Sequence, residues 1–374
     1  MADLELTQVI YDYQTLREMI NNVDADAYYQ LGCNIDCSES ANDGGWNSFD
    51  FKGTLVGGGY AICNLQMNET GLFKTLYGNV SGVGFLNCTV RNATRTGILA
   101  GDIRANTNLI ERCYVENCLV LPPLTKIPES RNLGGLAGRH FSGTIKECYV
   151  ANTVIGQEDS KKPQCKENAG GFIGGIGDDG NDMSIRGWAA GAVVDCYTQN
   201  CTIYTEKNGG GFCGYNNYEF RWDPQITGVK RCYSSSRVIL RDIKAIKGGF
   251  VASANQQALE YQEGNFYNLD VFGINNGKGY GYAKITEQMK DIETFEAQNW
   301  EFSIVNEDGT VVKKTWRIED GITYPYLQYN KQYKDIVPQS FLKVRNEDNE
   351  VLYAPLVNYN VVNLKGVPHL FIRV

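Results

Sequence analysis

The sequence predicts an all-β fold, a parallel β-helix or β-solenoid in which short strands stack from one coil to the next. The main observation is an internal repeat in which two phrases alternate. One phrase is a glycine doublet followed by an apolar run, and its second glycine recurs at Gly135, Gly171, Gly211 and Gly249. The other phrase is a Cys-Tyr pair, which recurs at Cys113-Tyr114, Cys148-Tyr149, Cys196-Tyr197 and Cys232-Tyr233.

Each repeat is expected to contain two strands, one after the glycines and one around the Cys-Tyr pair. The second run alternates apolar and polar residues, as in AVVDCYTQNCTIY, which is typical of a half-buried strand. Glycine doublets give the backbone the freedom that a sharp corner requires. A β-propeller is the main rival, but a blade needs four strands. The shorter spacing of 25 residues from Cys63 to Cys88 favours an open stack, which tolerates unequal coils.

The chain has twelve cysteines, and their recurrence at one point of each repeat predicts a buried column of thiols. Disulfide scaffolds are mostly small secreted proteins, which this long chain does not resemble. Pairs such as Cys33 and Cys37 do not have the spacing of zinc knuckles, and the chain has only two histidines. We therefore expect no metal and no cofactor, and we expect Cys63 and Cys88 to continue the column of Cys113 towards the N-terminus.

Both ends of the stack need a cover, because an end coil exposes unpaired strand edges and bare core. The run from Thr15 to Glu18 fits a capping box, which predicts a helix over 16–22 with Thr15 as its N-cap. A second short helix is expected over 286–295, followed by an aromatic plug that contains Trp300, Phe302, Trp316 and residues 324–327. Residues 331–374 are expected to form a small β module with a hairpin turn at 346–349.

Several segments resemble GLUG-repeat proteins, the glycine-rich β-helical modules of gut-bacterial surface proteins and of some of their phages. The resemblance lies in the entry segment GWNSFDFKGTLVGGGYAICNLQM, in the repeats and in the exit segments NWEFSIV and TWRIEDGITYPYLQY, and it covers residues 14–330. It implies a right-handed parallel β-helix but no reaction, because a scaffold defines the family. The expected division is an acidic N-terminal segment with a capping helix over 1–50, the β-helix over 51–284, a closing helix and aromatic plug over 285–330, and the β module over 331–374.

The charge pattern argues against two classes of partner. The net charge is −8, and residues 1–50 hold ten acids against the single base Arg17. No basic footprint suits a nucleic acid, and no apolar stretch approaches the ~18 residues of a membrane span.

The start, MADLELTQVI, lacks the basic and apolar regions of a signal peptide, so synthesis in a cytoplasm is expected. One repeat is rich in basic residues: Lys230, Arg231, Arg237, Arg241, Lys244 and Lys247. These side chains form either a solvated face or a contact for an anionic partner.

Two neighbouring repeats carry insertions at the same corner. The distance from the second glycine to the cysteine is 13 residues after Gly135, but 25 after Gly171 and 21 after Gly211. Stacked coils would place these loops side by side, where aromatic and acidic side chains suit either a sugar or a protein contact. A third interpretation is that the loops bury their own aromatic residues. The candidate binding residues are Asp178, Asp179, Asp182, Trp188, Tyr215, Tyr218, Glu219, Trp222 and Asp223.

No catalytic residue is predicted, because both histidines, His140 and His369, fit structural positions better than catalytic ones. A bacteriophage virion component, such as a tail fibre, spike or head decoration, is the favoured hypothesis for a β-helix without signal peptide, cofactor motif or metal set. Its expected partners are other virion proteins, host-surface polysaccharide, and further copies of the chain through residues 331–374. The alternatives are a tail-spike-like polysaccharide hydrolase or lyase that uses two carboxylates, and a bacterial surface adhesin.

Overall fold

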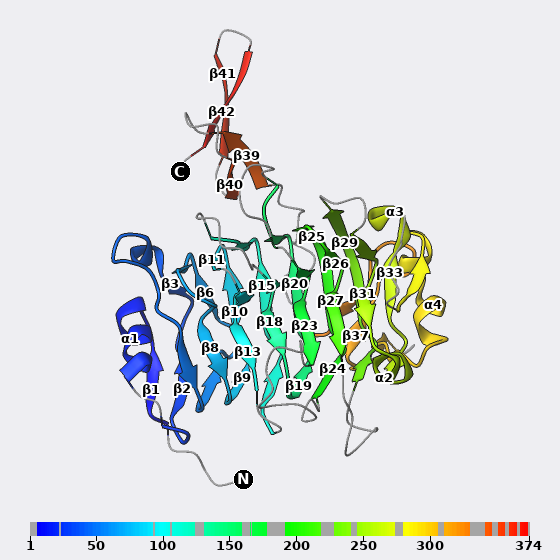
Figure 1. The fold of residues 1–374 in the computed structure, drawn as a ribbon, viewed down its shortest axis with the longest axis horizontal. Coiled ribbons are helices and arrows are strands. Elements are labelled where there is room, and N and C mark those ends of the chain that lie inside the picture. The colour runs from blue at the N-terminus through cyan, green and yellow to red at the C-terminus, as the bar shows by residue number, and fades with distance from the viewer. Residues whose placement is uncertain are drawn as a thin grey trace. The chain divides into compact units, whose positions relative to one another are not determined.

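The computed structural model describes residues 6–21, 24–92, 94–104, 107–123, 131–158, 165, 167–177, 191–217, 228–240, 245–273, 280–305 and 310–329, and the backbone of four strands beyond residue 340. The chain forms two compact units, residues 1–331 and 332–374. In the first unit, strands lie side by side from the N-terminal to the C-terminal end and pair in parallel with strands of the neighbouring coils (Figure 1). This arrangement confirms an all-β fold built mainly on parallel strands.

Four sheets of parallel strands can be traced in the described part of the first unit. Sheet 1 consists of β1 (Gln8–Ile10), β2 (Tyr28–Leu31), β5 (Thr54–Val56), β9 (Asn79–Ser81), β14 (Leu109–Glu111), β19 (Gly143–Lys146), β24 (Gly191–Val194), β28 (Gly228–Lys230) and β32 (Gln262–Glu263). Sheet 2 consists of β3 (Ile35–Asp36), β6 (Ala61–Cys63), β7 (Gln66–Met67), β10 (Gly84–Leu86), β11 (Thr89–Arg91), β15 (Tyr114–Glu116), β16 (Leu119–Leu121), β20 (Tyr149–Ala151), β21 (Val154–Ile155), β25 (Tyr197–Thr205), β29 (Tyr233–Leu240), β33 (Phe266–Asn268) and β34 (Tyr282–Lys284).

The other two sheets are smaller. Sheet 3 consists of β12 (Thr94–Thr96), β17 (Arg131–Gly134), β22 (Asn168–Gly170), β26 (Asn208–Gly210) and β30 (Ile246–Gly248). Sheet 4 consists of β4 (Phe49–Phe51), β8 (Phe73–Leu76), β13 (Ala100–Ile103), β18 (Ala137–His140), β23 (Ile173–Gly177), β27 (Cys213–Asn217) and β31 (Val251–Ala254). The chain visits the sheets in a fixed order, so that β14 to β18 make one coil and β19 to β23 make the next.

A coil therefore holds four or five strands, and the prediction of two strands per repeat was wrong. The longer runs are broken at corners where one residue has a positive φ. Glu147 (φ 51°) separates β19 from β20, and Asn152 (φ 49°) separates β20 from β21. Asparagine enters this left-handed region more readily than most residues. Asparagines accordingly occupy the second of these corners in successive coils, at Asn64, Asn87, Asn117, Asn152 and Asn200.

Seven of the free cysteines directly follow a corner residue with a positive φ, namely Cys88, Cys113, Cys118, Cys148, Cys196, Cys201 and Cys232. All twelve cysteines are unpaired thiols in this structure. The first column consists of Cys113, Cys148, Cys196 and Cys232, and the backbone N–H of each of the first three donates to the Sγ atom of the next at 3.3–3.4 Å. The N–H of Cys232 donates to Oδ1 of Asn265 at 3.0 Å. These thiols are buried inside the coils, where they pack as small apolar groups.

Cys63 and Cys88 do not belong to that column, and their predicted placement was wrong. The N–H of Cys88 donates to the Sγ atom of Cys118 at 3.2 Å, so Cys88 lies in a second column at the following corner. Cys63 lies within β6 and pairs with Leu86 in β10. The shorter N-terminal coils shift the cysteines relative to the corners, which the spacing of identical residues did not reveal.

Two aromatic stacks follow the coil axis. Inside the coils, the rings of Phe172, Phe212 and Phe250 stack at centroid distances of 4.8 and 4.7 Å. On the outer face of sheet 2, tyrosine rings stack at 4.9–5.4 Å with nearly parallel planes, in the order Tyr114, Tyr149, Tyr197 and Tyr233. The Cys-Tyr phrase thus places its cysteine inside the stack and its tyrosine outside it.

The N-terminal end of the stack is covered by α1 (Tyr13–Glu18) and η1 (Met19–Asn21) (Figure 1). The N-cap is Asp12 and not Thr15, because the carboxylate of Asp12 accepts the backbone N–H of Thr15 at 2.8 Å. The hydroxyl of Thr15 donates to the same carboxylate at 2.6 Å. Leu16 and Met19 are buried in the core, as the apolar face of the predicted helix requires.

The remaining helices are short. They are η2 (Ser38–Ala41), α2 (Gln256–Glu260), α3 (Leu269–Phe272), η4 (Gln288–Lys290) and α4 (Ile292–Glu296). The single helix expected over 286–295 is divided at Asp291, which is extended and caps α4 by accepting the N–H of Glu293. No helix in the described residues is long and apolar enough to cross a membrane.

The described residues from 299 to 329, here called the strap, pack against the outside of sheet 2. The strap contains two antiparallel pairs, β35 (Ile304–Val305) with β36 (Val311–Val312) and β37 (Trp316–Arg317) with β38 (Tyr326–Leu327). Trp316 contacts the rings of Tyr197 and Tyr233, and Tyr329 donates to the carbonyl oxygen of Glu147. The aromatic residues expected to plug the end of the stack therefore extend back along its side.

The second unit, described here by its backbone alone, contains two antiparallel hairpins. One pairs β39 (Phe341–Arg345) with β40 (Val351–Pro355), on either side of the turn expected at 346–349. The other pairs β41 (Tyr359–Leu364) with β42 (Val367–Ile372).

Candidate functional site

The two insertions begin and end at neighbouring strands. β23 pairs with β27, and Gly177 at the end of β23 lies opposite Asn217 at the end of β27. The chain re-enters sheet 1 through β24 and β28, which also pair, with Ala192 opposite Gly228. Residues 178–190 and 218–227 therefore leave one edge of sheet 4 and return to sheet 1 in adjacent coils.

Most of the candidate binding residues lie in those two segments, outside the described residues. They are Asp178, Asp179, Asp182, Trp188, Tyr218, Glu219, Trp222 and Asp223. Tyr215 is described: it lies in β27, is 4% exposed, and stands opposite Gly175 of β23. A Cβ atom at Gly175 would lie 1.8 Å from the ring of Tyr215, so the glycine is needed for the tyrosine to lean across the neighbouring coil.

The register places Tyr215 in a row with charged residues. On sheet 4, Asp102 pairs with Arg139, Arg139 pairs with Gly175, and Gly175 pairs with Tyr215. Paired residues in one row point to the same face of a sheet. This row therefore brings an ion pair close to the ends of β23 and β27, where the two inserted segments begin. Arg139 is completely buried and Asp102 is 6% exposed.

Three arginines converge on the carboxylate of Asp102, and we call these four residues the arginine cluster. Arg139 donates from Nε to Oδ1 at 3.0 Å and from Nη2 to Oδ2 at 3.3 Å. Arg104 donates from Nη2 to Oδ2 at 3.0 Å, and Arg95 from Nη1 to Oδ2 at 3.4 Å. Phe141 lies beneath the guanidinium groups of Arg104 and Arg139, each 5.7 Å from its ring centroid.

The arginine cluster was missed in the sequence, although a signal was present. The glycine phrase continues with Arg139 and His140 in one repeat, whereas the next repeat continues with Gly175 and Ile176 at the paired positions. A charged side chain at a position that is glycine in the next coil marks a departure from the repeat. Arg95 could not have been found in this way, because it reaches Asp102 from another sheet.

His140 adjoins the cluster but is a structural residue. It is fully buried, and its Nε2 lies 3.1 Å from the carbonyl oxygen of Gly143. Burial lowers the pKa of His140 to about 4, so the ring is neutral at pH 7. In the ranges that the structure describes, no three His, Cys, Asp or Glu side chains come together as a metal site.

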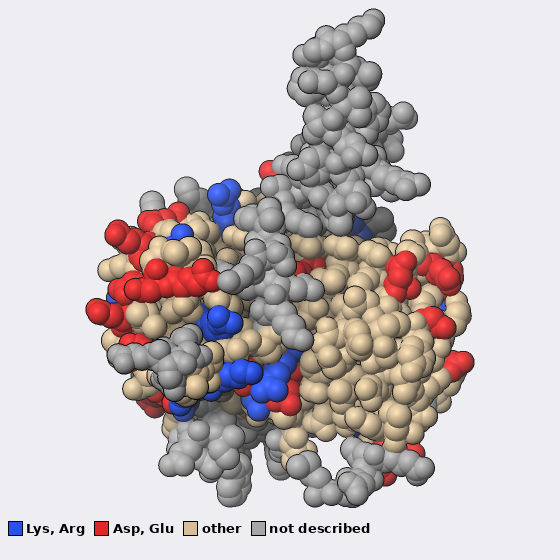
Figure 2. Space-filling model, turned by 180° about the vertical axis from the view of Figure 1, so that it is seen from behind, with Lys and Arg blue, Asp and Glu red and all other residues tan. Residues whose placement is uncertain are grey.

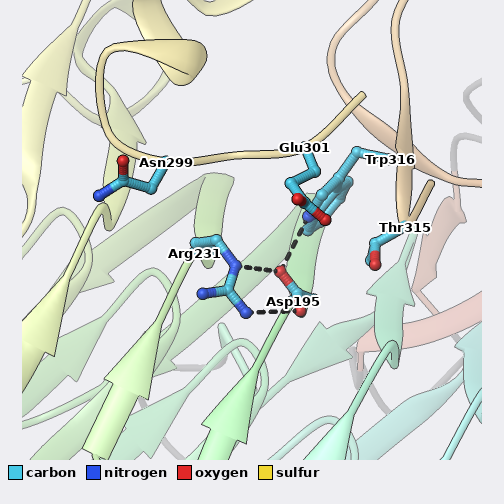
Figure 3. A pocket seen from close by; sticks show the side chains of 6 residues that line it. All are labelled: Asp195, Arg231, Asn299, Glu301, Thr315 and Trp316. Atoms are coloured by element: carbon cyan, nitrogen blue, oxygen red, sulfur yellow. Dashed lines mark hydrogen bonds and ion pairs between the residues drawn. The ribbon is translucent and has the colours of Figure 1, made fainter. Parts of the chain in front are cut away.

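A small polar pocket of about 280 Å³ lies between the coils and the strap (Figure 3). Asp195 and Arg231 form a bidentate ion pair there, with distances of 2.8 and 2.9 Å. The indole N–H of Trp316 donates to Oδ1 of Asp195 at 3.0 Å, and Glu301 and Thr315 line the opposite wall. The ion pair raises the pKa of Arg231, which keeps it charged. The bond from Trp316 to Asp195 joins residues 121 apart, so it fastens the strap to the coils.

The basic run does not form one uniform surface in the described residues. Arg231 pairs with Asp195, Lys230 lies 3.9 Å from Glu263, and Lys247 donates to the carbonyl oxygen of Phe272. Arg241 and Lys244 lie outside the described residues. Figure 2 shows basic and acidic side chains close together over the middle coils, and a broad area without charged side chains over the N-terminal coils. The run is thus partly neutralised within the chain.

Comparisons with known proteins support the fold. No known family model matches the sequence, and no curated protein does. A solved structure from Bacteroides ovatus, described as a "putative immunoglobulin A1 protease", is similar, with a TM-score of 0.54 and 17% sequence identity over 87% of this chain and 93% of that chain. At this identity the likeness concerns the fold alone. The chain shares a fold rich in parallel β-strands with a protein from a gut bacterium.

Proposed function

We propose that this chain is a non-enzymatic binding and structural protein, built on a right-handed parallel β-helix of GLUG repeats. The pairing of β23 with β27 and of β24 with β28 carries this proposal. Two consecutive coils hold the inserted segments 178–190 and 218–227 at neighbouring points, so both segments are available to one ligand. Their sequences combine Asp, Trp and Tyr residues, which suit contacts with a sugar or with another protein.

We further propose that the chain is part of a bacteriophage virion, as a tail fibre, spike or head decoration. The division into a long stack and a small separate unit supports this proposal. Such a division suits a protein that attaches through one part and presents the other. Residues 332–374 would contact virion proteins or further copies of the chain, and the stack would contact host-surface polysaccharide. The protease description of the structural neighbour is not transferred, because function depends on a site and not on a fold.

Replacement of the inserted segments tests the binding proposal. Residues 178–190 and 218–227 are exchanged for Gly-Ser linkers of equal length, and the purified chain is tested against a panel of capsular polysaccharides and isolated particle proteins. We expect binding by the native chain, loss of binding in the variant, and a similar thermal unfolding temperature. A control variant replaces residues 124–130, between β16 and β17. Unchanged binding after the double replacement would overturn the proposal.

The virion proposal is tested on the particle itself. Mass spectrometry of purified phage particles, and immunogold labelling with an antibody against this chain, should detect it at a fixed copy number per particle. Its absence from particles that contain capsid and tail proteins would exclude a virion role. A longer reading frame that begins with a signal peptide would then favour the alternative of a bacterial surface adhesin.

One alternative activity, cleavage of a polysaccharide, follows from the carboxylates in the inserted segments. Two suitably separated carboxylates are enough for glycoside hydrolysis. If the chain is such an enzyme, it will release new reducing ends from a bound polysaccharide, and the changes Asp182→Asn and Glu219→Gln will abolish this release without abolishing binding. Binding without the release of reducing ends supports the non-enzymatic proposal.

A further inference from the structure

The pocket between the coils and the strap is built on two corner residues. Asp195 and Arg231 each precede a cysteine of the first column, and each has a positive φ, of 54° and 49°. They occupy the same corner of consecutive coils, since the strands before them, β24 and β28, are paired. Their side chains meet as a bidentate ion pair on the side of the coils that the strap covers. The corners thus provide one fixed wall of the pocket.

The strap provides the other wall. It contributes Asn299, Glu301, Thr315 and Trp316 (Figure 3). Trp316 is completely buried, and its indole N–H donates to Asp195 at 3.0 Å, which fixes this wall against the first. The side chain of Glu301 is 66% exposed and lies at the mouth of the pocket. None of these six lining residues belongs to the two inserted segments.

The pocket offers hydrogen-bonding groups that the described part of the chain leaves open. Arg231 directs Nε and Nη2 to Asp195, and its third nitrogen, Nη1, points away from that carboxylate (Figure 3). The hydroxyl of Thr315 makes no hydrogen bond to another described residue. Glu301 contacts Lys314 through Oε1 at 3.4 Å, so its second oxygen is an open acceptor. A guanidinium N–H, a hydroxyl and a carboxylate oxygen therefore line the same small space.

The charges at the pocket are compensated within the chain. Arg231 is paired with Asp195, and Glu301 lies within 3.4 Å of Lys314. A strongly charged ligand would therefore meet little net opposite charge, whereas a hydroxyl group can accept from Arg231 and donate to Glu301. The volume of about 280 Å³ lies just below the ~300–1,000 Å³ that is typical of sites for drug-sized ligands. The pocket therefore suits a small ligand that carries hydroxyl groups on several sides.

We infer that this pocket binds a single neutral sugar unit through its hydroxyl groups. Both the coils and the strap contribute lining residues, so a bound sugar bridges the two and holds the strap in place. The inference does not depend on the proposed function, because the inserted segments take no part in this site. A free sugar and the terminal unit of a glycan present nearly the same hydroxyl groups, and the experiment below separates these two sources.

The test uses the full chain with glucose, galactose, mannose and N-acetylglucosamine, each as the free sugar and as its methyl glycoside. A ligand with about 12 non-hydrogen atoms should bind with a Kd on the order of 1 mM, which saturation-transfer NMR detects. We expect at least one sugar to bind and to slow the hydrogen exchange of residues 310–329, since a ligand stabilises the state that binds it. Equal binding of the methyl glycoside indicates a terminal glycan unit, and its loss indicates a free sugar.

Two variants separate the pocket from the ion pair at its mouth. Glu301→Ala removes a lining carboxylate together with its contact to Lys314, and binding should weaken about tenfold. Lys314→Ala breaks the same contact but removes no lining residue, so it is the matched control and should bind as the native chain does. Thr315→Val keeps a similar shape without the hydroxyl and should weaken binding about threefold or more. Thermal unfolding checks that each variant is folded.

Several results would overturn the inference. None of the sugars could bind, or Lys314→Ala could weaken binding as much as Glu301→Ala does. Sulfate or putrescine, used as anionic and cationic probes, could displace the sugar, which would mean that charge and not hydroxyl groups decides recognition. A chain whose inserted segments are replaced should still bind the sugar with the same Kd. Loss of the sugar in that chain would assign it to the inserted segments, so the proposed function would stand and this inference would fail.

Discussion

At the scale of single residues, the corners of the coils depend on one side-chain atom each. The backbone N–H of Cys88 donates to the Sγ atom of Cys118, and the N–H of Cys118 donates to the hydroxyl of Thr153. The cysteine sulfur and the threonine hydroxyl oxygen thus both accept a backbone N–H at the same corner of successive coils. The requirement is for a small side chain that can accept a hydrogen bond, and cysteine meets it while adding apolar volume to the core.

This requirement predicts different outcomes for two substitutions of similar size. Cys118→Thr reproduces the neighbouring coil and should change the free energy of unfolding by less than about 1 kcal/mol. Cys118→Val leaves the N–H of Cys88 without its acceptor and should cost about 1–3 kcal/mol. Urea unfolding followed by circular dichroism measures both. Equal stability of the two variants would contradict the role given to Sγ.

His140 makes stability depend on pH. The pKa of His140 is about 4 in the folded chain, whereas an unperturbed histidine side chain has a pKa of 6.5. The unfolded chain therefore binds a proton that the folded chain does not bind between pH 6.5 and 4. The stabilising contribution is complete above pH 6.5 and is lost as the pH falls towards 4.

The change His140→Gln removes this proton uptake. Between pH 7 and pH 5, the free energy of unfolding of the native chain should fall by about 2 kcal/mol more than that of the variant. Chemical denaturation at the two pH values measures the difference, and titrating groups common to both proteins cancel. A parallel fall in both proteins would mean that His140 is already protonated in the folded state or that its site admits water.

At the scale of elements, the strap is held by two indole N–H groups that meet different acceptors. Trp316 donates to the carboxylate of Asp195 at 3.0 Å, and Trp300 donates to the carbonyl oxygen of Gly264 at 2.9 Å. Both indoles are buried, so replacement by phenylalanine removes mainly the hydrogen bond and a similar part of the ring. Hydrogen bonds to charged groups are about twice as strong as those between neutral groups.

Trp316→Phe should therefore cost more stability than Trp300→Phe, by about 1 kcal/mol. Trp316→Phe also leaves the carboxylate of Asp195 with Arg231 as its remaining donor among the bonds described for it. Urea unfolding midpoints of the two variants give the comparison, and hydrogen exchange of residues 310–329 shows whether the strap opens locally. A larger loss in Trp300→Phe would contradict the anchoring role of Asp195.

At the scale of the whole molecule, the first unit contains its own core. Its buried residues run from Ile10 to Leu327, and residues 1–331 form one compact unit by themselves. A chain that ends at residue 331 should therefore fold, with a melting temperature within about 4 °C of the full chain. Differential scanning calorimetry tests this expectation. Aggregation or a much lower melting temperature would mean that the second unit is needed for the stability of the first.

The repeat made the parallel stack predictable, because the Cys-Tyr and glycine phrases recur with the register of the structure: Tyr149 pairs with Tyr197, and Tyr197 pairs with Tyr233. The number of strands per coil was not predictable from alternation, since a left-handed residue such as Asn152 breaks a strand without breaking the apolar pattern. The predicted N-cap was three residues late, because both Asp12 and Thr15 fit that role locally.

The sequence predicted the position of the two inserted segments but not the arginine cluster beside them. The unequal spacings located the two insertions, and strand pairing places their ends side by side. The arginine cluster depends on contacts between residues distant in sequence, such as Arg139 with Asp102, 37 residues apart. A single sequence carries no signal for such a pairing, because each partner by itself is an ordinary charged residue in a β protein.

The strap also sets the number of coils that the molecule can accommodate. In an open stack, duplication or loss of one complete coil would preserve every pairing register. The strap crosses successive coils, however, and is bonded to Gly264, to Asp195 and to the carbonyl of Glu147. An extra coil between Glu147 and Gly264 would separate these anchor points while the length of the strap stayed fixed. The fixed length of the strap thus limits the number of coils between Glu147 and Gly264. Duplication of a coil should be accepted more readily among the coils that precede Glu147.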